Sequence, residues 1–178
     1  MRVIAGKAKG HSIKAPKGMS TRPTSDKVRE AIFSTIASKV SGAQVLDLFA
    51  GSGALGIESL SRGAEHSVFV DNSAASLTAI RGNLVSVGLE SRAAVIKKDV
   101  FRYVSSYKEA AFDLIFLDPP YKIGVNEILG VIKSCLGLLS TEGLIVVEHT
   151  KKIRLEDHIS IGKIKAYGQT AVTYIGRD

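Results

Sequence analysis

The chain has 178 residues and 45% hydrophobic content, which predicts one domain whose core needs no disulfide or metal for stability. Cys135 is the one cysteine, so an intrachain disulfide framework is excluded, and its apolar helical surroundings predict a buried packing role. The first residues lack the apolar stretch of a signal peptide, and no apolar run approaches the roughly 20 residues of a membrane span. We therefore expect a cytoplasmic protein with no membrane contact, and we expect it to act as a monomer.

The formal net charge is +7, and most of it lies near the N-terminus. Residues 1–30 contain eight Lys or Arg and two acidic residues, which gives this segment a net charge of +6. The rest of the chain holds the other 16 of 24 basic and the other 15 of 17 acidic residues. This asymmetry predicts an anionic partner that the N-terminal segment contacts, while an ordinary solvated surface explains the charge equally well.

The first 40 residues predict a basic extension made of a short hairpin, a loop and a helix. Either Thr24 or Ser25 supplies the N-cap of that helix, and the apolar residues that follow lie on one helical face. The predicted ranges are 2–5 and 11–14 for the hairpin strands, 15–23 for the loop, and 25 to about 38 for the helix.

From residue 43 onward, short apolar strands alternate with amphipathic helices. This alternation predicts an α/β domain over residues 41–178, with a mostly parallel, Rossmann-like sheet covered by helices on both faces. The last two strands flank Gly168 and predict an antiparallel closing edge. The predicted strands are 44–49, 67–70, 93–97, 112–117, 143–147, 159–166 and 170–175, and the predicted helices are 54–62, 73–87, 100–108 and 125–139.

A glycine-rich turn follows the first strand of this domain. Residues 45–56 read Val-Leu-Asp-Leu-Phe-Ala-Gly-Ser-Gly-Ala-Leu-Gly, so Gly51, Gly53 and Gly56 form a G-x-G-x-x-G pattern between a strand and a helix. Glycines permit the tight turn and let a ligand approach the backbone. Asp71 ends the second strand, where a carboxylate binds ribose hydroxyls. The pattern predicts a site for an adenosine-containing cofactor at the carboxyl edge of the sheet.

Asp47 indicates which cofactor this is. Its carboxylate, just before the turn, would repel the pyrophosphate of a nicotinamide dinucleotide, which a helix N-terminus otherwise favours. It suits instead the ammonium and sulfonium groups of S-adenosylmethionine. Asp99 follows the third strand, where it predicts either a hydrogen bond from the adenine amine or a helix N-cap. The predicted cofactor-binding residues are Asp47, Phe49, Gly51, Gly53, Asp71, Asn72, Asp99 and Val100.

The fourth strand ends in Asp118-Pro119-Pro120-Tyr121. The prolines stiffen the turn, and the Asp118 carboxylate and nearby backbone carbonyls present hydrogen-bond acceptors. Acceptors that bind the two hydrogens of a base amine favour a more nucleophilic nitrogen, and the Tyr121 ring can stack on a flipped base. An ordinary strand-ending turn is the alternative. The shared sheet edge with the glycine turn favours a catalytic role for these four residues.

Several segments together resemble the RsmD family. These segments are Arg2-Val-Ile-Ala-Gly-Lys7, Arg22-Pro-Thr-Ser-Asp-Lys-Val-Arg-Glu30, Asp47-Leu-Phe-Ala-Gly-Ser-Gly53, Ala54-Leu-Gly-Ile-Glu58, Ser61-Arg-Gly-Ala64, Asp118-Pro-Pro-Tyr121 and Tyr167-Gly-Gln-Thr170. The resemblance covers nearly the whole chain, and it departs from the family at Ser25 and Lys27, where Thr and Arg are common.

The resemblance implies a class I methyltransferase that uses S-adenosylmethionine to methylate guanine N2 in 16S ribosomal RNA, within an assembling or assembled small subunit. It also implies the roles of the predicted site residues. Asp118, Pro119, Pro120 and Tyr121 would be catalytic, and the acidic and glycine residues above would hold the donor. The RNA-binding residues would be Arg2, Lys7, Lys9, Arg22, Thr24 and Arg29.

Other functions remain open at this stage. The same tetrapeptide serves DNA adenine-N6 methylation, although no target-recognition insert separates Gly53 from Asp118. The glycine turn alone is also typical of a nicotinamide-dependent oxidoreductase, and a non-catalytic RNA-binding module would retain the same fold. Cys135 lacks the context of a cytosine-C5 nucleophile. The four histidines share no metal-ligand spacing, so no metal is expected. Glu148 and His149 follow the fifth predicted strand, a position compatible with bordering the base pocket, and neither is included among the predicted site residues.

Overall fold

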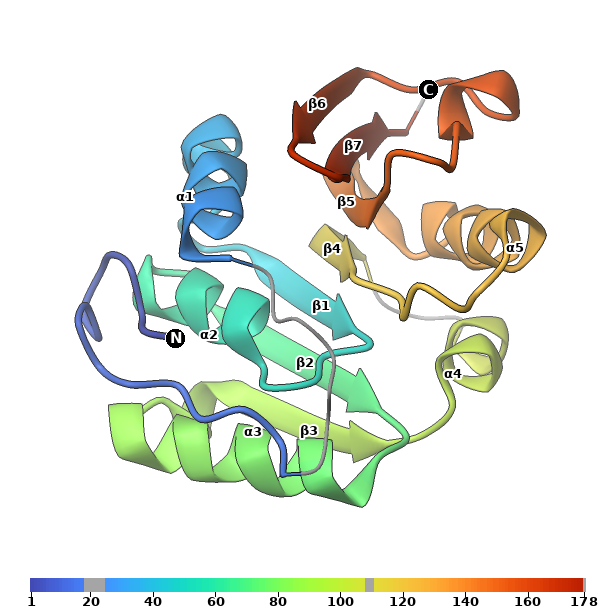
Figure 1. Cartoon of the computed structure of the whole chain (residues 1–178). Helices are drawn as coiled ribbons and strands as arrows, with labels where there is room; N and C mark the ends of the chain where they lie inside the picture. The colour runs from blue at the N-terminus through green and yellow to red at the C-terminus, as the bar shows by residue number, and fades with distance from the viewer. Residues whose placement is uncertain (18–24, 108–110, 178) are drawn as a thin grey trace.

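The computed structural model describes residues 1–17, 25–107 and 111–177. Strands lie side by side in the middle of this part of the chain and helices lie outside them (Figure 1). They form one sheet in the order β3-β2-β1-β4-β5-β7-β6. The first five strands in this order run parallel, and β7 runs antiparallel to both of its neighbours, which confirms the predicted sheet and its closing edge. The strands are β1 Gln44–Leu48, β2 His66–Asp71, β3 Ala93–Lys97, β4 Phe112–Leu117, β5 Leu139–Thr150, β6 Lys163–Tyr167 and β7 Thr170–Gly176.

Helices pack on both faces of the sheet because successive strand residues point to opposite sides. In β1, Val45 joins one apolar core and Leu46 joins the other. The first core contains residues of α1, α2 and α3, and the second contains residues of α4 and α5. The helices are α1 Asp26–Thr35, α2 Ala54–Ser61, α3 Ala74–Val87, α4 Val100–Ser106 and α5 Val125–Leu136.

Several predicted boundaries are wrong by three or more residues. Helix α1 starts after Ser25, whose hydroxyl accepts from the Val28 amide, but it ends at Thr35 and continues only as a 3-10 turn over Ala37–Lys39. Helix α5 ends at Leu136 instead of residue 139. Strand β5 runs over Leu139–Thr150 instead of 143–147, since Leu139 already pairs with Phe112 of β4 before a shift in register and the far end pairs with β7 up to Thr150. Strand β6 begins at Lys163 instead of residue 159, because a 3-10 turn over Leu155–Asp157 precedes it.

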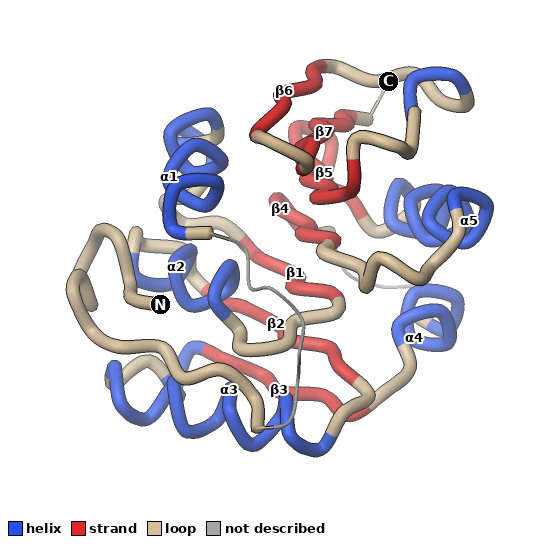
Figure 2. Tube along the Cα trace, in the orientation of Figure 1, coloured by secondary structure: helices blue, strands red, loops and turns tan. Residues whose placement is uncertain are grey.

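The N-terminal segment, residues 1–17, runs as a loop over α2 and along α3 (Figure 2). The predicted hairpin is reduced to a single bridge between Arg2 and Ser12. Val3, Ala8 and Ile13 are buried in the same core as α1, α2 and α3. The segment is therefore packed into the domain and shares its core.

Two side chains of α2 fix this segment by its backbone. The Glu58 carboxylate accepts from the amides of Ile4 at 2.8 Å and Ala5 at 3.0 Å. The Ser61 hydroxyl donates to the Ala5 carbonyl at 2.6 Å and accepts from the Ala8 amide at 3.0 Å. Because Glu58 is fully buried, these bonds form out of contact with water and hold the segment in one position.

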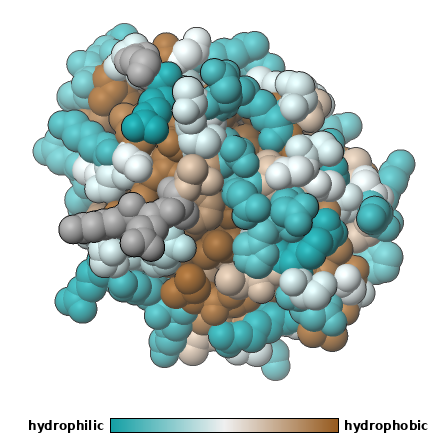
Figure 3. Space-filling view, turned by 180° about the vertical axis from the view of Figure 1, so that it is seen from behind, coloured by the Kyte–Doolittle hydropathy of each residue, from teal (hydrophilic) through white to brown (hydrophobic). Residues whose placement is uncertain are grey.

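The surface seen from behind is mostly hydrophilic, with hydrophobic residues gathered in a band down its middle (Figure 3). Across the described residues, no helix has both the length and the apolar character that a membrane crossing requires.

Candidate active site

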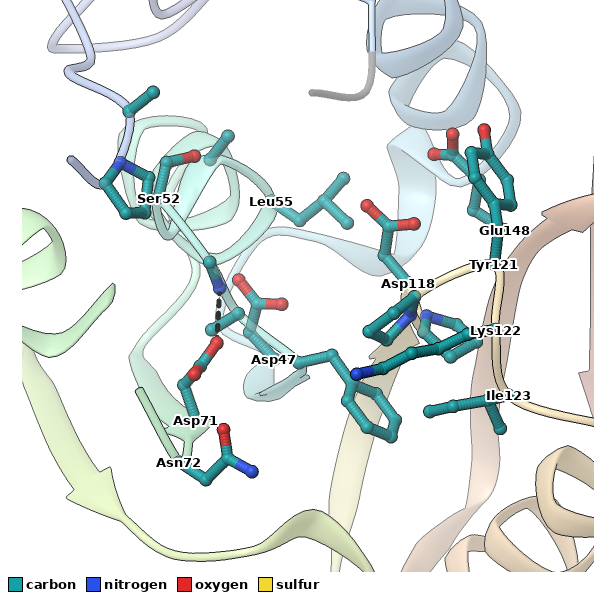
Figure 4. Close-up of a pocket in the computed structure, with 18 of the residues that line it drawn as sticks. Asp47, Ser52, Leu55, Asp71, Asn72, Asp118, Tyr121, Lys122, Ile123 and Glu148 are labelled. Carbon is teal, nitrogen blue, oxygen red and sulfur yellow. Dashed lines mark hydrogen bonds between the residues drawn. The ribbon is translucent and has the colours of Figure 1, made fainter. Parts of the chain in front are cut away.

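A cavity of about 460 Å³ opens at the carboxyl ends of the parallel strands (Figure 4). Carboxylates from four strands face it: Asp47 from β1, Asp71 from β2, Asp118 after β4 and Glu148 from β5. Ligands of open α/β sheets bind at this edge. The other lining residues are Met1, Ala15, Pro16, Phe49, Ala50, Gly51, Ser52, Ala54, Leu55, Asn72, Asp99, Phe101, Pro119, Pro120, Tyr121, Lys122 and Ile123.

The turn between β1 and α2 has a left-handed backbone at three positions. Gly51 and Gly53 have φ values of 54° and 77°, and Phe49 adopts 58° although it carries a side chain. A bulky residue in this region is strained, and such strain is concentrated at functional sites. The Asp71 carboxylate supports the turn, since it accepts from the amides of Gly51 at 2.9 Å and Ser73 at 2.8 Å.

Asp47 is 2% exposed and accepts a hydrogen bond from the Gly56 amide at 2.9 Å. Burial raises the pKa of Asp47 well above its usual value, and the charges of Asp118 and Asp71 raise it further, while the Gly56 bond lowers it. The carboxyl groups of Asp47 and Asp118 therefore interact electrostatically across one cavity. A cluster of buried carboxylates is stabilised by a cation, so this end of the cavity suits an ammonium or sulfonium group and repels pyrophosphate.

Asp99 is the helix N-cap, one of the two roles considered for it, and the adenine contact stays a prediction. Its carboxylate caps α4 by accepting from the Arg102 amide at 3.1 Å, and it also lines the cavity. Val100, the next predicted cofactor residue, is instead 3% exposed within the second core, and Phe101 faces the cavity in its place. The Phe101 and Phe49 rings pack edge to face, with their centroids 6.2 Å apart, and give the cavity an aromatic wall.

Gly53 is a second predicted cofactor residue that does not line the cavity. A Cβ at this position would lie 3.2 Å from both Phe69 and Ile80, so the glycine serves the packing of α2. Gly56 serves the same purpose, because a Cβ there would lie 2.3 Å from the Phe69 ring. Of the three glycines, only Gly51 lines the cavity.

The Asp118-Pro119-Pro120-Tyr121 turn faces the cavity from the side opposite Asp71 (Figure 4). Pro119 is buried, which anchors the turn after β4, whereas Tyr121 is 65% exposed. An exposed ring beside a carboxylate is suited to stack on a planar ligand that enters from solvent. The predicted catalytic residues are thus brought to the same cavity as the predicted cofactor residues.

The predicted RNA-binding residues divide into three groups. Arg2, Lys7 and Lys9 are exposed on the N-terminal segment, where their charges can reach an anionic partner. Arg22 and Thr24 lie outside the described residues. Arg29 is fully buried, and the expectation that it contacts RNA is wrong for this conformation.

Arg29 joins elements inside the protein. Its guanidinium donates to the Arg2 carbonyl and to the Asp26 carboxylate, and its Nε lies 3.9 Å from the Glu58 carboxylate. Burial lowers the pKa of Arg29, while Glu58 and Asp26 raise it. Sequence alone does not distinguish Arg29 from an exposed arginine that binds phosphate. Only the fold shows that Glu58 of α2 and the Arg2 carbonyl contact its guanidinium.

The sequence prediction missed residues whose type carries no cofactor signal. Phe101, Leu55 and Lys122 line the cavity because of where the strands end. Of the two residues considered at the border of the base pocket, Glu148 lines the cavity from β5. Asn83 of α3 is 2% exposed and bridges two segments far apart in sequence. Its amide donates to the carbonyls of Lys14 and Ser52, each at 2.9 Å, and its oxygen accepts from the Lys14 amide at 2.9 Å.

The chain is similar to known proteins over its whole length. Residues 1–176 match the family model described as "Conserved hypothetical protein 95". The chain is 42% identical to the "Putative rRNA methyltransferase YlbH" of Bacillus subtilis, over 97% of this chain and 96% of that protein. It is 34% identical to the "Ribosomal RNA small subunit methyltransferase D" of Escherichia coli, over 83% of this chain and 74% of that protein.

Solved structures show the same fold. The "Putative methyltransferase yhhF from Escherichia coli" superposes with a TM-score of 0.85 at 31% identity and covers 100% of this chain and 98% of that one. The structure described as "SMU.776, a putative methyltransferase complexed with SAH" superposes over 83% of this chain and 48% of that one with a TM-score of 0.71. At 18% identity, this second likeness shows the fold alone. With a family model matched almost end to end and a relative of 42% identity, the chain belongs to the RsmD family.

Proposed function

We propose that this protein transfers a methyl group from S-adenosylmethionine to the N2 amine of a guanine in 16S ribosomal RNA. The observation that carries the proposal is that Asp47 and Asp118 face one cavity, which joins a cation-binding end to a base-binding turn. Relatives named as ribosomal RNA small subunit methyltransferases support the RNA substrate. We further propose that the enzyme acts as a monomer in the cytoplasm, on an assembling or assembled small subunit.

The cavity residues fit the methyl donor. When bound, S-adenosylmethionine supplies an electrophilic methyl group on a positively charged sulfur. Asp47 is placed to attract the cationic end, and the Asp71 carboxylate, which already orders the turn through Gly51, has acceptor capacity left for ribose hydroxyls. Phe49 and Phe101 offer aromatic surface to an adenine.

The opposite end of the cavity is suited to hold the reacting base. The Asp118 carboxylate accepts a hydrogen bond from the exocyclic amine, and this contact favours a pyramidal and more nucleophilic nitrogen. Tyr121 stacks on the base and fixes the direction of the amine toward the donor. Placing both reactants in one cavity supplies most of the rate, because alignment replaces the search for a productive encounter.

The N-terminal segment is the part of this protein that we assign to the RNA backbone. Arg2, Lys7 and Lys9 are exposed on it, while Glu58 and Ser61 hold its backbone against α2. Fixed cations of this kind bind phosphates and make the affinity depend on salt concentration. With few residues placed to read base edges, the segment recognises the shape of folded RNA.

A DNA adenine-N6 methyltransferase and a nicotinamide-dependent oxidoreductase are the competing functions. The described residues between the glycine turn and Asp118 form α2, β2, α3, β3, α4 and β4, which are all core elements. A DNA enzyme would need additional surface for reading a sequence in this interval. The oxidoreductase is disfavoured because the acceptor groups of Asp47 and Asp71 line the cavity beside the glycine turn, where a pyrophosphate would need hydrogen-bond donors.

The test is to incubate the protein with donor carrying a labelled methyl group and small subunits from cells that lack this modification. We expect label in N2-methylguanine of 16S RNA, identified by mass spectrometry after nuclease digestion. Duplex DNA and naked 16S RNA in parallel reactions distinguish the substrate classes. Protein that binds S-adenosylhomocysteine in calorimetry but leaves the subunits unlabelled contradicts the proposal.

A further inference from the structure

Glu148 is a carboxylate of the cavity that the proposed chemistry has not used. It lies near the end of β5, is 7% exposed, and lines the cavity together with Asp118 and Tyr121. In Figure 4, its carboxylate lies at the end of the cavity where Asp118 and Tyr121 lie, away from Asp71 and Asn72. The end of the cavity that holds the base is therefore lined by two carboxylates from different strands.

The neighbouring residue on β5 has a different position. The His149 ring is 3% exposed, and its nitrogens contact the Thr173 hydroxyl at 2.8 Å and the Thr150 carbonyl at 2.9 Å. Because side chains alternate along a strand, His149 and Glu148 point to opposite faces of the sheet. The His149 ring packs against Thr173 of β7, while Glu148 faces the cavity. Strand geometry thus selects Glu148 as the residue of this pair that meets a ligand.

Two acceptors beside each other match one nucleobase edge. Guanine carries its exocyclic amine next to N1–H, so its Watson–Crick edge presents neighbouring donors. Adenine and cytosine carry their amine next to an unprotonated ring nitrogen, which is an acceptor. A carboxylate next to the amine-binding group therefore accepts a hydrogen bond from guanine and repels the other two bases.

We propose that Glu148 is a specificity-determining residue. Its carboxylate accepts a hydrogen bond from N1–H of the guanine whose N2 amine faces Asp118. The inference rests on the proposed function, and it adds the group that selects the base. Each ionised carboxylate has several lone pairs, so accepting from the base is compatible with other contacts of these side chains. Burial strengthens the selection, because a desolvated carboxylate facing an acceptor loses its hydrogen bond and gains no water in return.

The substrate 2-aminopurine removes this contact. It retains the amine at the same carbon as guanine, but its N1 is an acceptor and its C6 carries hydrogen in place of oxygen, so the contribution of Glu148 is measured by how a change at this residue alters the preference. Small subunits reconstituted with 16S RNA carrying either guanine or 2-aminopurine at the mapped target nucleotide give two values of kcat/KM. The wild-type protein is expected to prefer guanine by about 10-fold or more, the range of discrimination that one well-placed bidentate contact gives.

The variant Glu148→Gln is expected to shift the substrate preference from guanine toward 2-aminopurine. Its carboxamide can donate to N1 of 2-aminopurine, which a carboxylate cannot do, while its neutral oxygen accepts from N1–H of guanine more weakly than a charged carboxylate does. The ratio of the two kcat/KM values should shift toward 2-aminopurine by about 10-fold, while affinity for S-adenosylhomocysteine stays within about 2-fold of wild type. A merely structural role for Glu148 would lower both rates together and leave the ratio unchanged.

The matched control is Glu142→Gln, which makes the same change at an exposed position near the start of β5. It should leave the ratio at the wild-type value. Equal rates on both substrates with wild-type protein, or an unchanged ratio in Glu148→Gln, overturn the assignment of Glu148. Equal wild-type rates on the two substrates overturn the assignment even when the variant fails to fold. Wild-type protein that methylates neither substrate refutes the proposed function itself, and an intact guanine rate with a lost base preference refutes only this inference.

Discussion

Asn83→Asp is a sharp test of how the N-terminal segment and the cofactor turn are held together. The substitution preserves the shape of the side chain but replaces its NH₂ group with an oxygen. Two bonds of 2.9 Å, to the carbonyls of Lys14 and Ser52, are lost, while the bond accepted from the Lys14 amide can remain. The two carbonyl oxygens would then face a carboxylate at the buried position 83.

The expected destabilisation is about 2–3 kcal/mol, since each buried acceptor left without its donor costs about 1 kcal/mol or more. For a chain of 178 residues this corresponds to a fall in Tm of about 5–10 °C. Because Ser52 lies between Gly51 and Ala54 in the turn that lines the cavity, affinity for S-adenosylhomocysteine should fall as well. Differential scanning calorimetry and isothermal titration measure the two effects.

The pH dependence distinguishes this cause from a general packing defect. Burial among carbonyls raises the pKa of the introduced carboxyl in the folded state. At pH values between the ordinary pKa of an aspartate and this raised pKa, the folded protein therefore binds more protons than the unfolded chain. Stability then falls as pH rises through that interval, and the difference from wild type should be larger at pH 8 than at pH 5. Asn126→Asp, an exposed change on α5, is the control. A Tm within 1 °C of wild type at both pH values, with unchanged affinity, would refute the reasoning.

Four further predictions follow from the site and the core. Asp71→Ala should weaken S-adenosylhomocysteine binding by about 10-fold or more in calorimetry, because the turn loses the acceptor of its Gly51 amide, and unchanged affinity would contradict the assigned cofactor site. Asp118→Ala should lower methyl transfer by about 100-fold or more while that affinity is retained, and a normal turnover would exclude its catalytic role. Gly56→Ala should lower Tm, since its Cβ would meet the Phe69 ring at 2.3 Å and overpacking costs about 1–3 kcal/mol. Arg29→Met should destabilise by about 3 kcal/mol, because it leaves Glu58 buried with one cation fewer, yet the salt dependence of RNA binding should match wild type.

The sequence predicted the sheet well because its strands are encoded locally. Buried parallel strands such as Phe112–Leu117 are continuous apolar runs, and a glycine turn after a strand marks the cofactor edge. These signals sufficed to place Asp47, Asp71 and Asp118 at one edge, and the structure brings the three carboxylates to one cavity.

The remaining features depend on contacts between distant segments. Arg29 was misread because its neighbours in sequence do not reveal that Glu58 and the Arg2 carbonyl surround it. The packing role of Gly53 was not predicted, because a glycine that permits ligand approach and one that permits helix packing have the same sequence pattern. Asn83 gave no signal, since a buried amide is informative only when its partners, Lys14 and Ser52, are known.

The docking of residues 1–17 against α2 and α3 constrains how such an enzyme can diversify. The segment that we propose for RNA contact also supplies part of the cavity wall, through Ala15 and Pro16. An exchange of this segment between relatives, made to redirect an enzyme to another RNA, must carry compatible partners for Glu58, Ser61 and Asn83. Under the proposed function, a graft of the RNA-contacting segment alone would therefore also disturb the cavity that we assign to the methyl donor.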